Sequence, residues 1–431
     1  MSRAMKDSGI PWIGEMPKEW GTMKIKQIMR KKSIKGFPNE IVLSLYRDYG
    51  VVPKDSRDDN HNVTSEDTSN YKLVDIGDFV INKMKAWQGS MAVSQYRGII
   101  SPAYYICQFK KEDVEKKYIH YLLRNDSYKT EYMRLSTGLR VGQWDLNIED
   151  FLCIPMVLPP LSEQQRIAEF LDRKCVEIDE AIALQEEFID ELKSYKQSVI
   201  TEAVTRGLNP NVKFKDSGID WIGKIPQGWE ETKVLNLLSM PITDGPHETP
   251  KLYDKGIPFI SADAVSDGYL NFENKRGYIS EEYYLECCKK YTPQKGDVFM
   301  IKSGASTGRT AIVETDMVFT IWSPLAVFRV NPTYMYERFL LYVLRSDGFQ
   351  KQVENKWTYG TQQNIGMRAL ERLIVSYPTM KEQHQIADYL DNKCTDIDNL
   401  IAIKQQKIEE LKDYKKSIIY EYVTGKKEVN G

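Results

Sequence analysis

The stretch that decides the fold begins at Glu163 and reads EQQRIAEFLDRKCVEIDEAIALQEEFIDELKSYKQSVITEAVT. A second version, EQHQIADYLDNKCTDIDNLIAIKQQKIEELKDYKKSIIYEYVT, begins at Glu382. The two copies run without a gap to Thr205 and Thr424, at a constant offset of 219 residues (424 − 205). A helix of this length would be ~60 Å long, which is longer than an ordinary domain buries.

Both copies carry apolar residues at the alternating three- and four-residue spacing of a coiled-coil seam. The predicted seam consists of Ile178, Ile182, Ile189, Leu192 and Val199 in the first copy and Ile397, Ile401, Ile408, Leu411 and Ile418 in the second. Polar residues such as Lys196 and Lys415 interrupt this seam and would fix its register. Charges flank the seam on both sides, which favours an antiparallel helix pair over the alternative of helices lying on a globular core.

A second repeat precedes each long segment. KDSGIPWIGEMPKEW begins at Lys6 and KDSGIDWIGKIPQGW at Lys215, with ten of fifteen positions identical and an offset of 209 (215 − 6). The chain is therefore a tandem duplication of a short motif, a variable region and a long helix. An antiparallel pair would give it an internal pseudo-two-fold axis, with one variable region near each end of the rod. We expect the repeated tryptophans to seat each domain on the helix pair.

Capping residues predict where the long helices begin and end. Ser162 with Gln165 and Thr379 with Glu382 fit the capping-box pattern, and Gly207 and Gly425 are expected to stop the helices. The resulting domain boundaries are 1–158 for the first domain, 159–208 for the first helix, 209–377 for the second domain, 378–425 for the second helix and 426–431 for a tail.

The two variable regions share one plan although their sequences differ. GDFVINKMKAWQGSMAVSQ from Gly77 and GDVFMIKSGASTGRTAIVE from Gly296 each predict a turn, an apolar strand, a polar loop with glycine and another strand. A further strand and a short helix follow in both regions. We therefore predict an α+β fold, with two mixed strand-and-helix domains separated by two long helices that form an antiparallel coiled coil.

Polar and basic residues in the variable regions could contact DNA. The segment MKIKQIMRKKSIK, from Met23 to Lys35, contains no acidic residue and could bind several phosphates. Gln and Asn can pair with adenine, and Arg or Lys with guanine, in the major groove. The candidates are Lys24, Lys26, Arg30, Lys31, Lys32, Lys83, Lys85, Gln88, Arg140, Gln143, Lys302, Arg309, Gln362, Gln363 and Asn364. A solvated basic face and ordinary surface loops are the alternatives.

The composition limits the other function classes. The net charge of −2 is not that of a strongly basic DNA-binding protein, so partners would have to supply part of the phosphate contact. The six cysteines form no Cys-x-x-Cys pair and there are four histidines, so we expect no metal site. No apolar run reaches 18 residues, so we expect no membrane span. We also expect a cytoplasmic protein with reduced thiols.

Nothing in the sequence predicts catalytic residues. SGASTGRT (Ser303–Thr310) has Arg309 where a phosphate-binding P-loop has lysine, and it leads into a strand instead of a helix. We interpret it as a hairpin loop; nucleotide hydrolysis by this loop is an alternative. The Asp/Asn-Pro-Pro-Tyr/Phe motif of amino-methylation is absent from the sequence.

The chain resembles the specificity subunit of a type I restriction-modification system. The resemblance is carried by DSGIPWIGEMPKEW and DSGIDWIGKIPQGW, by the helix starts PPLSEQQRIAEFLD and EQHQIADYLD, and by the paired Gly-Asp strands, and it spans residues 6–425. It implies that each variable region is a target recognition domain for double-stranded DNA. It also implies that the helix pair docks two methyltransferase subunits, to which two restriction subunits, ATP-dependent translocases and nucleases, are added.

The resemblance further implies that this subunit is not catalytic. S-adenosylmethionine, ATP and Mg²⁺ would bind to the partner subunits, and no cofactor is expected in this chain. No base-reading residue is carried over, because these regions vary within the family. The alternative from another functional class is a coiled-coil scaffold that binds protein and no DNA.

Overall fold

A computed structural model describes residues 3–57, 64–65, 67–110, 112–138, 144–219, 222–359 and 363–429. The chain divides into two compact units. Unit 1 comprises Met1–Glu186 with Gln405–Gly431, and unit 2 comprises Glu187–Lys404. Each unit therefore contains one variable region together with a part of each long helix.

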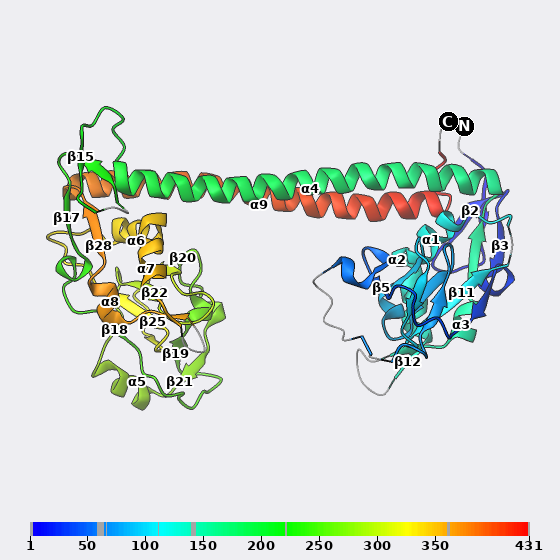
Figure 1. The fold of residues 1–431 in the computed structure, drawn as a ribbon, viewed down its shortest axis with the longest axis horizontal. Helices are drawn as coiled ribbons and strands as arrows, with labels where there is room; N and C mark the ends of the chain where they lie inside the picture. Colours follow the sequence, from blue (N-terminus) through cyan, green and yellow to red (C-terminus); the bar gives the residue numbers. More distant parts are fainter. Residues whose placement is uncertain are drawn as a thin grey trace. The chain divides into compact units, whose positions relative to one another are not determined.

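Unit 1 is built on an antiparallel sheet in the order β4-β11-β8-β9. Its strands are β1 (Met5–Asp7), β2 (Glu15–Pro17), β3 (Gly21–Lys24), β4 (Met29–Lys32), β5 (Leu43–Tyr46), β6 (Gly50–Pro53), β7 (Lys72–Val74), β8 (Phe79–Asn82), β9 (Met91–Val93), β10 (Gly98–Ile100), β11 (Tyr104–Phe109), β12 (Ser136–Thr137), β13 (Asp145–Leu146) and β14 (Pro155–Leu158). Its shorter helices are α1 (Lys116–Arg124), α2 (Asp126–Leu135) and α3 (Ile148–Leu152) (Figure 1).

Unit 2 is built on a sheet in the order β18-β25-β22-β23-β20. Its strands are β15 (Phe214–Asp216), β16 (Lys224–Pro226), β17 (Glu230–Lys233), β18 (Thr243–Asp244), β19 (Ile257–Ile260), β20 (Gly268–Tyr269), β21 (Gly277–Ile279), β22 (Val298–Ile301), β23 (Thr310–Ile312), β24 (Thr320–Ile321), β25 (Leu325–Phe328), β26 (Thr358–Tyr359), β27 (Gln363–Asn364) and β28 (Ile374–Tyr377). Its shorter helices are α5 (Glu281–Cys288), α6 (Glu337–Arg345), α7 (Asp347–Asn355) and α8 (Met367–Glu371).

The central strands of both sheets match the predicted Gly-Asp hairpins. β8 pairs antiparallel with β9 and with β11, and β22 pairs in the same way with β23 and β25. The loop at Ser303–Thr310 joins two antiparallel strands, so its interpretation as a hairpin is confirmed. Gly89 and Gly308 both have positive φ, 81° and 95°. Glycine adopts this conformation without steric cost, so both loops can turn at this matched position despite their different sequences.

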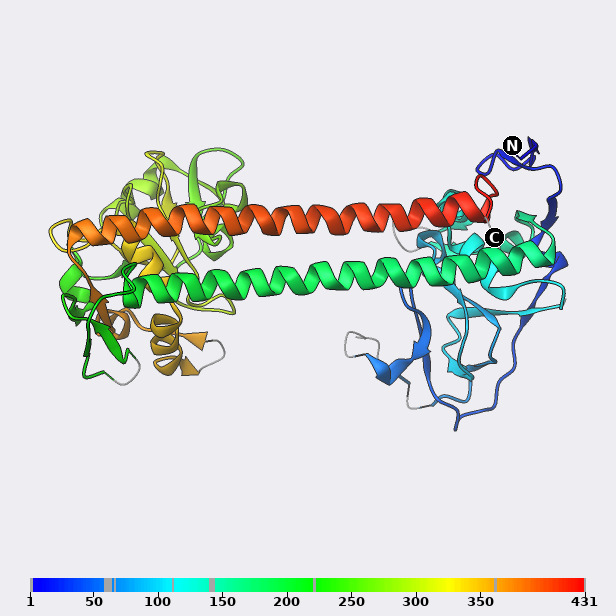
Figure 2. The ribbon, with the colours of Figure 1, turned by 90° about the horizontal axis from the view of Figure 1, so that it is seen from above.

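The two long helices are α4 (Leu161–Arg206) and α9 (Met380–Val423). In unit 1 the first half of α4 meets the last part of α9, where the rings of Phe170 and Tyr422 lie 4.4 Å apart. In unit 2 the last part of α4 meets the first half of α9, where Lys196 Nζ lies 2.8 Å from Asp398 Oδ2. The helices therefore run antiparallel in each unit, which confirms the predicted pairing (Figure 2).

The seam residues are buried or half-buried along the helix pair. Ile178, Ile189, Val199, Ile397, Ile408 and Ile418 are buried, and Ile182, Leu192, Ile401 and Leu411 are half-buried. Ile178 and Ile418 belong to the hydrophobic core of unit 1, and Val199 belongs to that of unit 2. Each domain core thus continues into the helix pair, which couples each domain to its own part of the seam.

The predicted cap at the first helix is wrong. α4 begins at Leu161, and the backbone N–H groups of Glu163 and Gln164 already donate to the Pro160 carbonyl. Ser162 therefore lies inside the first turn, because the preceding prolines bring the chain into the helix two residues earlier. The ends follow the prediction: α4 stops before Gly207 and α9 stops before Gly425, at φ of 72° and 73°.

All six cysteines are free thiols. Among the residues that the structure describes, no helix is both long and apolar enough to cross a membrane, and no group of three His, Cys, Asp or Glu side chains is placed to hold a metal ion.

Candidate nucleic-acid interface

Each variable region is seated on the start of the long helix that follows it by a tryptophan–glutamate contact. In unit 1, Trp20 Nε1 donates to Glu163 Oε2 at 3.0 Å, and Arg3 donates to both oxygens of the same carboxylate at 2.5 and 2.9 Å. The bonds to Glu163 raise the pKa of Arg3 above its ordinary value. Trp20 is only 1% exposed, so this contact is part of the core.

Unit 2 repeats this contact with fewer partners. Trp229 Nε1 donates to Glu382 Oε1 at 3.2 Å. The glycine that ends each long helix lies against the same indole: a Cβ on Gly207 would be 3.4 Å from Trp229, and one on Gly425 would be 3.0 Å from Trp20. The atoms nearest to these two Cβ positions are Glu382 Oε1, at 3.0 Å from Gly207, and the Pro17 ring beside Gly425. Glycine therefore serves the positive φ at each helix end and leaves room for the seating contact.

A second pair of contacts is also duplicated. Tyr121 donates to Asp172 Oδ1 at 2.8 Å in unit 1, and Tyr342 donates to Asp391 Oδ1 at 2.7 Å in unit 2. Because the aspartates belong to α4 and α9, each joins a long helix to the short helix α1 or α6. These contacts position the variable domains in the same way on both copies of the repeated helix.

The glutamine that follows Glu163 or Glu382 makes a third duplicated contact. Gln164 accepts from the backbone N–H of Glu115 at 2.9 Å, and Gln383 accepts from that of Tyr336 at 2.8 Å. Both glutamines are nearly fully buried. Of the predicted tryptophan anchors, Trp12 packs edge-on against Tyr128 at 5.9 Å, while Trp221 lies outside the described residues.

The hairpin loops that these contacts position differ between the units. In unit 1 the β8–β9 loop forms a 3₁₀ helix, η3 (Lys83–Gln88), which begins at an Asn82 side-chain cap. Lys85 is exposed, and Lys83 and Gln88 are half-buried. Trp87 packs edge-on against Trp144 at 5.2 Å. This packing is that of two aromatic side chains that anchor the loop.

In unit 2 the β22–β23 loop lies beside the segment around β27. Ser303 forms an isolated bridge with Asn364, and Gly304 N–H donates to the Gln363 carbonyl at 3.0 Å. Arg309 and Asn364 are exposed. The structure thus brings the loop candidate Arg309 and the segment of Gln363 and Asn364 to one region of unit 2. Gln362 lies outside the described residues, as do Arg140 and Gln143 in unit 1.

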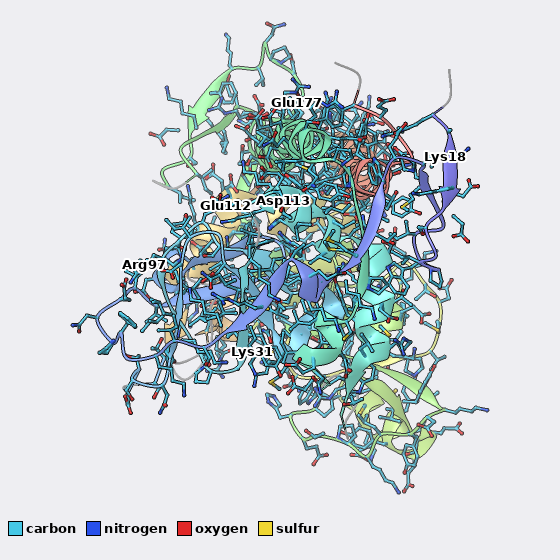
Figure 3. The ribbon with its side chains drawn as sticks, turned by 90° about the vertical axis from the view of Figure 1, so that its right-hand side faces the viewer. Lys18, Lys31, Arg97, Glu112, Asp113 and Glu177 are labelled. Carbon is cyan, nitrogen blue, oxygen red and sulfur yellow. The ribbon has the colours of Figure 1, made fainter. Side chains whose placement is uncertain are left out.

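The basic segment near the start of the chain separates into two groups. Lys24, Lys26, Arg30 and Lys31 are exposed, and Figure 3 labels Lys31. Lys32 points the other way, is buried, and lies 2.6 Å from Asp75 and 2.5 Å from Asp78. Burial alone would lower the pKa of Lys32, but the bonds to these carboxylates raise it.

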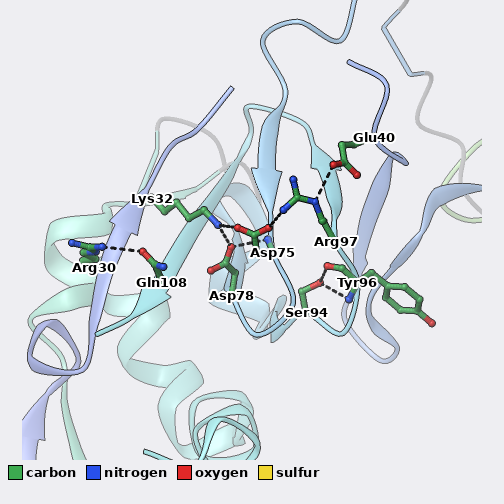
Figure 4. A network of polar contacts seen from close by, with 9 residues as sticks. All are labelled: Arg30, Lys32, Glu40, Asp75, Asp78, Ser94, Tyr96, Arg97 and Gln108. Carbon is green, nitrogen blue, oxygen red and sulfur yellow. Dashed lines mark hydrogen bonds and ion pairs between the residues drawn. The ribbon is translucent and has the colours of Figure 1, made fainter. Parts of the chain in front are cut away.

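The carboxylates that hold Lys32 belong to a wider polar network. Arg97 joins Asp75 and Glu40, and Arg30 donates to Gln108 at 3.1 Å on the neighbouring strand (Figure 4). Lys32 is paired with two carboxylates inside the domain, so its ammonium group is not available to bind DNA. Its partners lie more than 40 residues further along the chain, which is why the local pattern of basic residues could not predict them.

Lys302 is also paired with a carboxylate within its own unit. Its Nζ lies 3.2 Å from Asp244 Oδ2, and the side chain is 12% exposed. Asp244 is fully buried and also contacts Lys290 Nζ at 2.5 Å and His247 Nε2 at 3.1 Å. Lys83, which matches Lys302 in the aligned hairpins, has a different environment.

Sequence reasoning missed Lys72 and Tyr105 in unit 1. Lys72 Nζ lies 5.8 Å from the centroid of the Tyr105 ring, and Lys83 and Lys31 lie 5.1 and 5.7 Å from the same centroid. Burial, together with Lys83 and the neighbouring Lys31 and Lys35, lowers the pKa of Lys72 to about 8. An isolated lysine before a short apolar strand carries no sequence pattern that would have identified it.

The family model of the type I restriction modification DNA specificity domain matches residues 17–194 and again residues 227–413. The chain belongs to this family. The two matches coincide with the duplication, since each covers one variable region and the first part of the long helix after it. The specificity-subunit resemblance inferred from the repeated motifs is thereby confirmed.

Curated relatives carry the same description. The chain is 26% identical over 350 residues to the type I restriction enzyme MjaVIII specificity subunit of Methanocaldococcus jannaschii, covering 79% of this chain and 77% of the relative. It is 30% identical over 243 residues to the EcoBI specificity subunit of Escherichia coli, covering 53% and 49% of the two chains.

Solved structures support the fold. A chain from a study of complex assembly and conformational transition of the type I R-M system superposes with a TM-score of 0.69 at 18% identity, covering 95% of this chain and 98% of the other. The HsdS subunit of Thermoanaerobacter tengcongensis superposes with a TM-score of 0.53 at 17% identity, with the same coverage. The predicted arrangement of two mixed domains and two long helices is therefore that of this family.

Proposed function

We propose that this specificity chain reads a bipartite, asymmetric DNA target, with one target recognition domain for each half. The observation that carries the proposal is a contrast within the molecule. The contacts that seat each domain are duplicated, whereas the hairpin loops of the two domains differ in sequence and in local structure. Shared mounting contacts beneath two unlike surfaces are what two unlike half-sites require.

The physical advantage of two domains lies in discrimination. One small domain reads few base pairs, and each mismatched pair costs ~1–3 kcal/mol, which is too little to select a site in a genome. Linking two domains makes the second contact effectively intramolecular. The target then has two read parts with an unread spacer between them.

The proposed contact residues in unit 1 are Lys24, Lys26, Arg30, Lys31, Lys83, Lys85 and Gln88, with Arg140 and Gln143 kept as predictions outside the described residues. In unit 2 they are Arg309, Gln363 and Asn364, with Gln362 kept in the same way. Lys32 and Lys302 are set aside because carboxylates neutralise them. With a net charge of −2, the chain relies on partner subunits for further phosphate contacts.

The proposed partners are two methyltransferase subunits that dock on the helix pair and two restriction subunits that join through them. We assign S-adenosylmethionine, ATP and Mg²⁺ to these partners and no catalytic step to this chain. The complex would work in the cytoplasm, where the genomic DNA lies.

Sequencing that detects N6-methyladenine in the source cell, with and without this gene, tests the proposal. We expect one split motif with two different halves that loses its methylation when the gene is deleted. Unchanged methylation after deletion would contradict DNA reading. If the purified chain with its methyltransferase also had no sequence preference in a salt titration, the result would favour a protein-binding scaffold.

A further inference from the structure

The two domains differ in charge at one equivalent place in their sheets. Tyr105 on β11 pairs with Ile81 on β8, and Ala326 on β25 pairs with Met300 on β22. Because β8 and β22 belong to the aligned hairpins, Tyr105 and Ala326 occupy corresponding positions. The side chains gathered around these two positions can therefore be compared directly.

In unit 1 three ammonium groups surround a neutral ring. Lys31, Lys72 and Lys83 all lie within 6 Å of the Tyr105 centroid, at 5.7, 5.8 and 5.1 Å. They come from separate parts of the domain: β4, β7 and the start of η3. Tyr105 is half-buried, so the cluster lies at the surface of the sheet, where a ligand can reach it.

These three charges have no carboxylate partner among the described residues. In the described part of the chain, no ion pair joins Lys31, Lys72 or Lys83 to a carboxylate. Lys72 Nζ donates to the main-chain carbonyls of Pro102 and Tyr104, at 3.0 and 2.6 Å, and these bonds hold it in place without cancelling its charge. The nearby Asp145 acts on Tyr105, whose pKa is raised first by burial and then by this carboxylate.

In unit 2 the corresponding place contains a carboxylate. Asp244 pairs across the sheet with Ala326, and it binds Lys302 and Lys290. Lys302 matches Lys83 in the aligned hairpins. The second domain thus retains the lysine of the hairpin but pairs it with a buried acid, which Lys302 shares with Lys290.

We propose that Lys31, Lys72 and Lys83 around Tyr105 form a binding site for a phosphate of the DNA backbone, and that the second domain has no equivalent site. This inference rests on the proposed function. It adds that the two domains contribute unequally to binding of the DNA backbone. Three ammonium groups converging from different elements fit a tetrahedral anion with several acceptor oxygens. Phosphate contacts orient DNA without selecting its sequence, whereas a lysine that read guanine would act on one sequence alone, and this difference separates the two roles experimentally.

A salt titration of DNA affinity tests the site. The full-length chain bound to its methyltransferase subunit is titrated with a duplex containing its methylated motif and with a duplex of random sequence. Each lost phosphate contact lowers the slope of log affinity against log salt by about 0.9. We expect a decrease of about that size for Lys31→Met and for Lys83→Met, equal on both duplexes, whereas Lys83→Arg keeps the wild-type slope.

Lys295→Met is the charge-matched control, because Lys295 is an exposed lysine of unit 2, and it should leave the slope unchanged. Wild-type slopes in both Lys31→Met and Lys83→Met would overturn the phosphate site while leaving the proposed function intact, provided that the wild-type complex still prefers its motif. Loss of binding to the motif duplex alone would also overturn it, since that result would assign base reading to these lysines. No preference in the wild-type complex would overturn the proposed function itself.

Discussion

Lys196 in α4 and Lys415 in α9 occupy the same position of the repeated helix, yet their surroundings differ. Lys415 Nζ lies 2.7 Å from Asp179 and is half-buried. Lys196 binds the equivalent Asp398 and also Asp267, at 2.8 Å each, and only 10% of its side chain is exposed. Asp267 precedes β20 and is bound a second time by Arg345.

The helix repeat therefore does not by itself decide how each domain is held. The helical ion pair is common to both units, because it is part of the duplicated sequence. In unit 2 the additional ion pair joins Lys196 to Asp267 of the variable region. In unit 1 the additional contact is made at the tryptophan–glutamate pair, where Arg3 binds Glu163. Each domain has therefore acquired its own charged attachment beside the shared ones.

The largest expected effect concerns that glutamate. Glu163→Gln removes the negative charge that Arg3 and Trp20 share, and hydrogen bonds to charged groups are worth about 1.5–3 kcal/mol. We expect unit 1 to lose about 2–3 kcal/mol of unfolding free energy. The matched Glu382→Gln should cost unit 2 less than about 1 kcal/mol, because an amide oxygen can still accept from Trp229.

Urea unfolding with hydrogen exchange in each unit measures this difference. Equal losses for the two variants would contradict the role assigned to Arg3.

The second effect concerns acid. Burial, together with Arg124 and Lys117, lowers the pKa of His120 in α1 to about 3, and the equivalent residue of α6 is the buried Leu341. An unfolded histidine takes up its proton near pH 6.5. Because the folded pKa is lower, unit 1 loses stability as the pH falls from about 6.5 toward 3, by about 2 kcal/mol at pH 5.

His120→Leu should remove this loss, so that the variant has nearly the same unfolding free energy at pH 7 and pH 5 in unit 1. Hydrogen exchange of α1 at the two pH values measures it, with α6 as the internal control. An unchanged acid sensitivity in the variant would assign the loss to other groups.

A smaller effect is expected at the two lysines. Burial raises the pKa of Asp267, but Arg345 and Lys196 outweigh it and lower the pKa overall. Lys196→Met removes a mostly buried charge between two carboxylates and should cost about 1–2 kcal/mol. Lys415→Met breaks an exposed pair and should cost about 0.5 kcal/mol or less.

Thermal unfolding of both variants tests this order. A cost for Lys415→Met as large as that for Lys196→Met would mean that Asp267 adds nothing to the attachment of unit 2.

The sequence predicted what is local and periodic. The long helices, the Gly-Asp hairpins and the short helices at α1 and α6 follow from spacing and from turn residues that act within a few positions. The cap at Ser162 failed because the two prolines before it start the helix two residues earlier. The duplication itself was visible as identity at a constant offset.

The charged sites could not be predicted in the same way. Lys31 and Lys32 are neighbours in sequence, but on a strand they point to opposite faces, so one lies beside Tyr105 and the other between Asp75 and Asp78. Which face is acidic depends on strands that follow much later in the chain. The same holds for Asp244, whose effect on Lys302 appears only when β18, β22 and β25 form one sheet.

Exchange of one variable region tests whether each domain reads its own half of the target. Residues 21–157 are replaced with the corresponding region of another specificity subunit, and the N6-methyladenine motif of the cell is sequenced. The account predicts that one half of the motif changes while the other half stays the same. A change in both halves, or in neither, would contradict the claim that two separately seated domains each read their own part of the target.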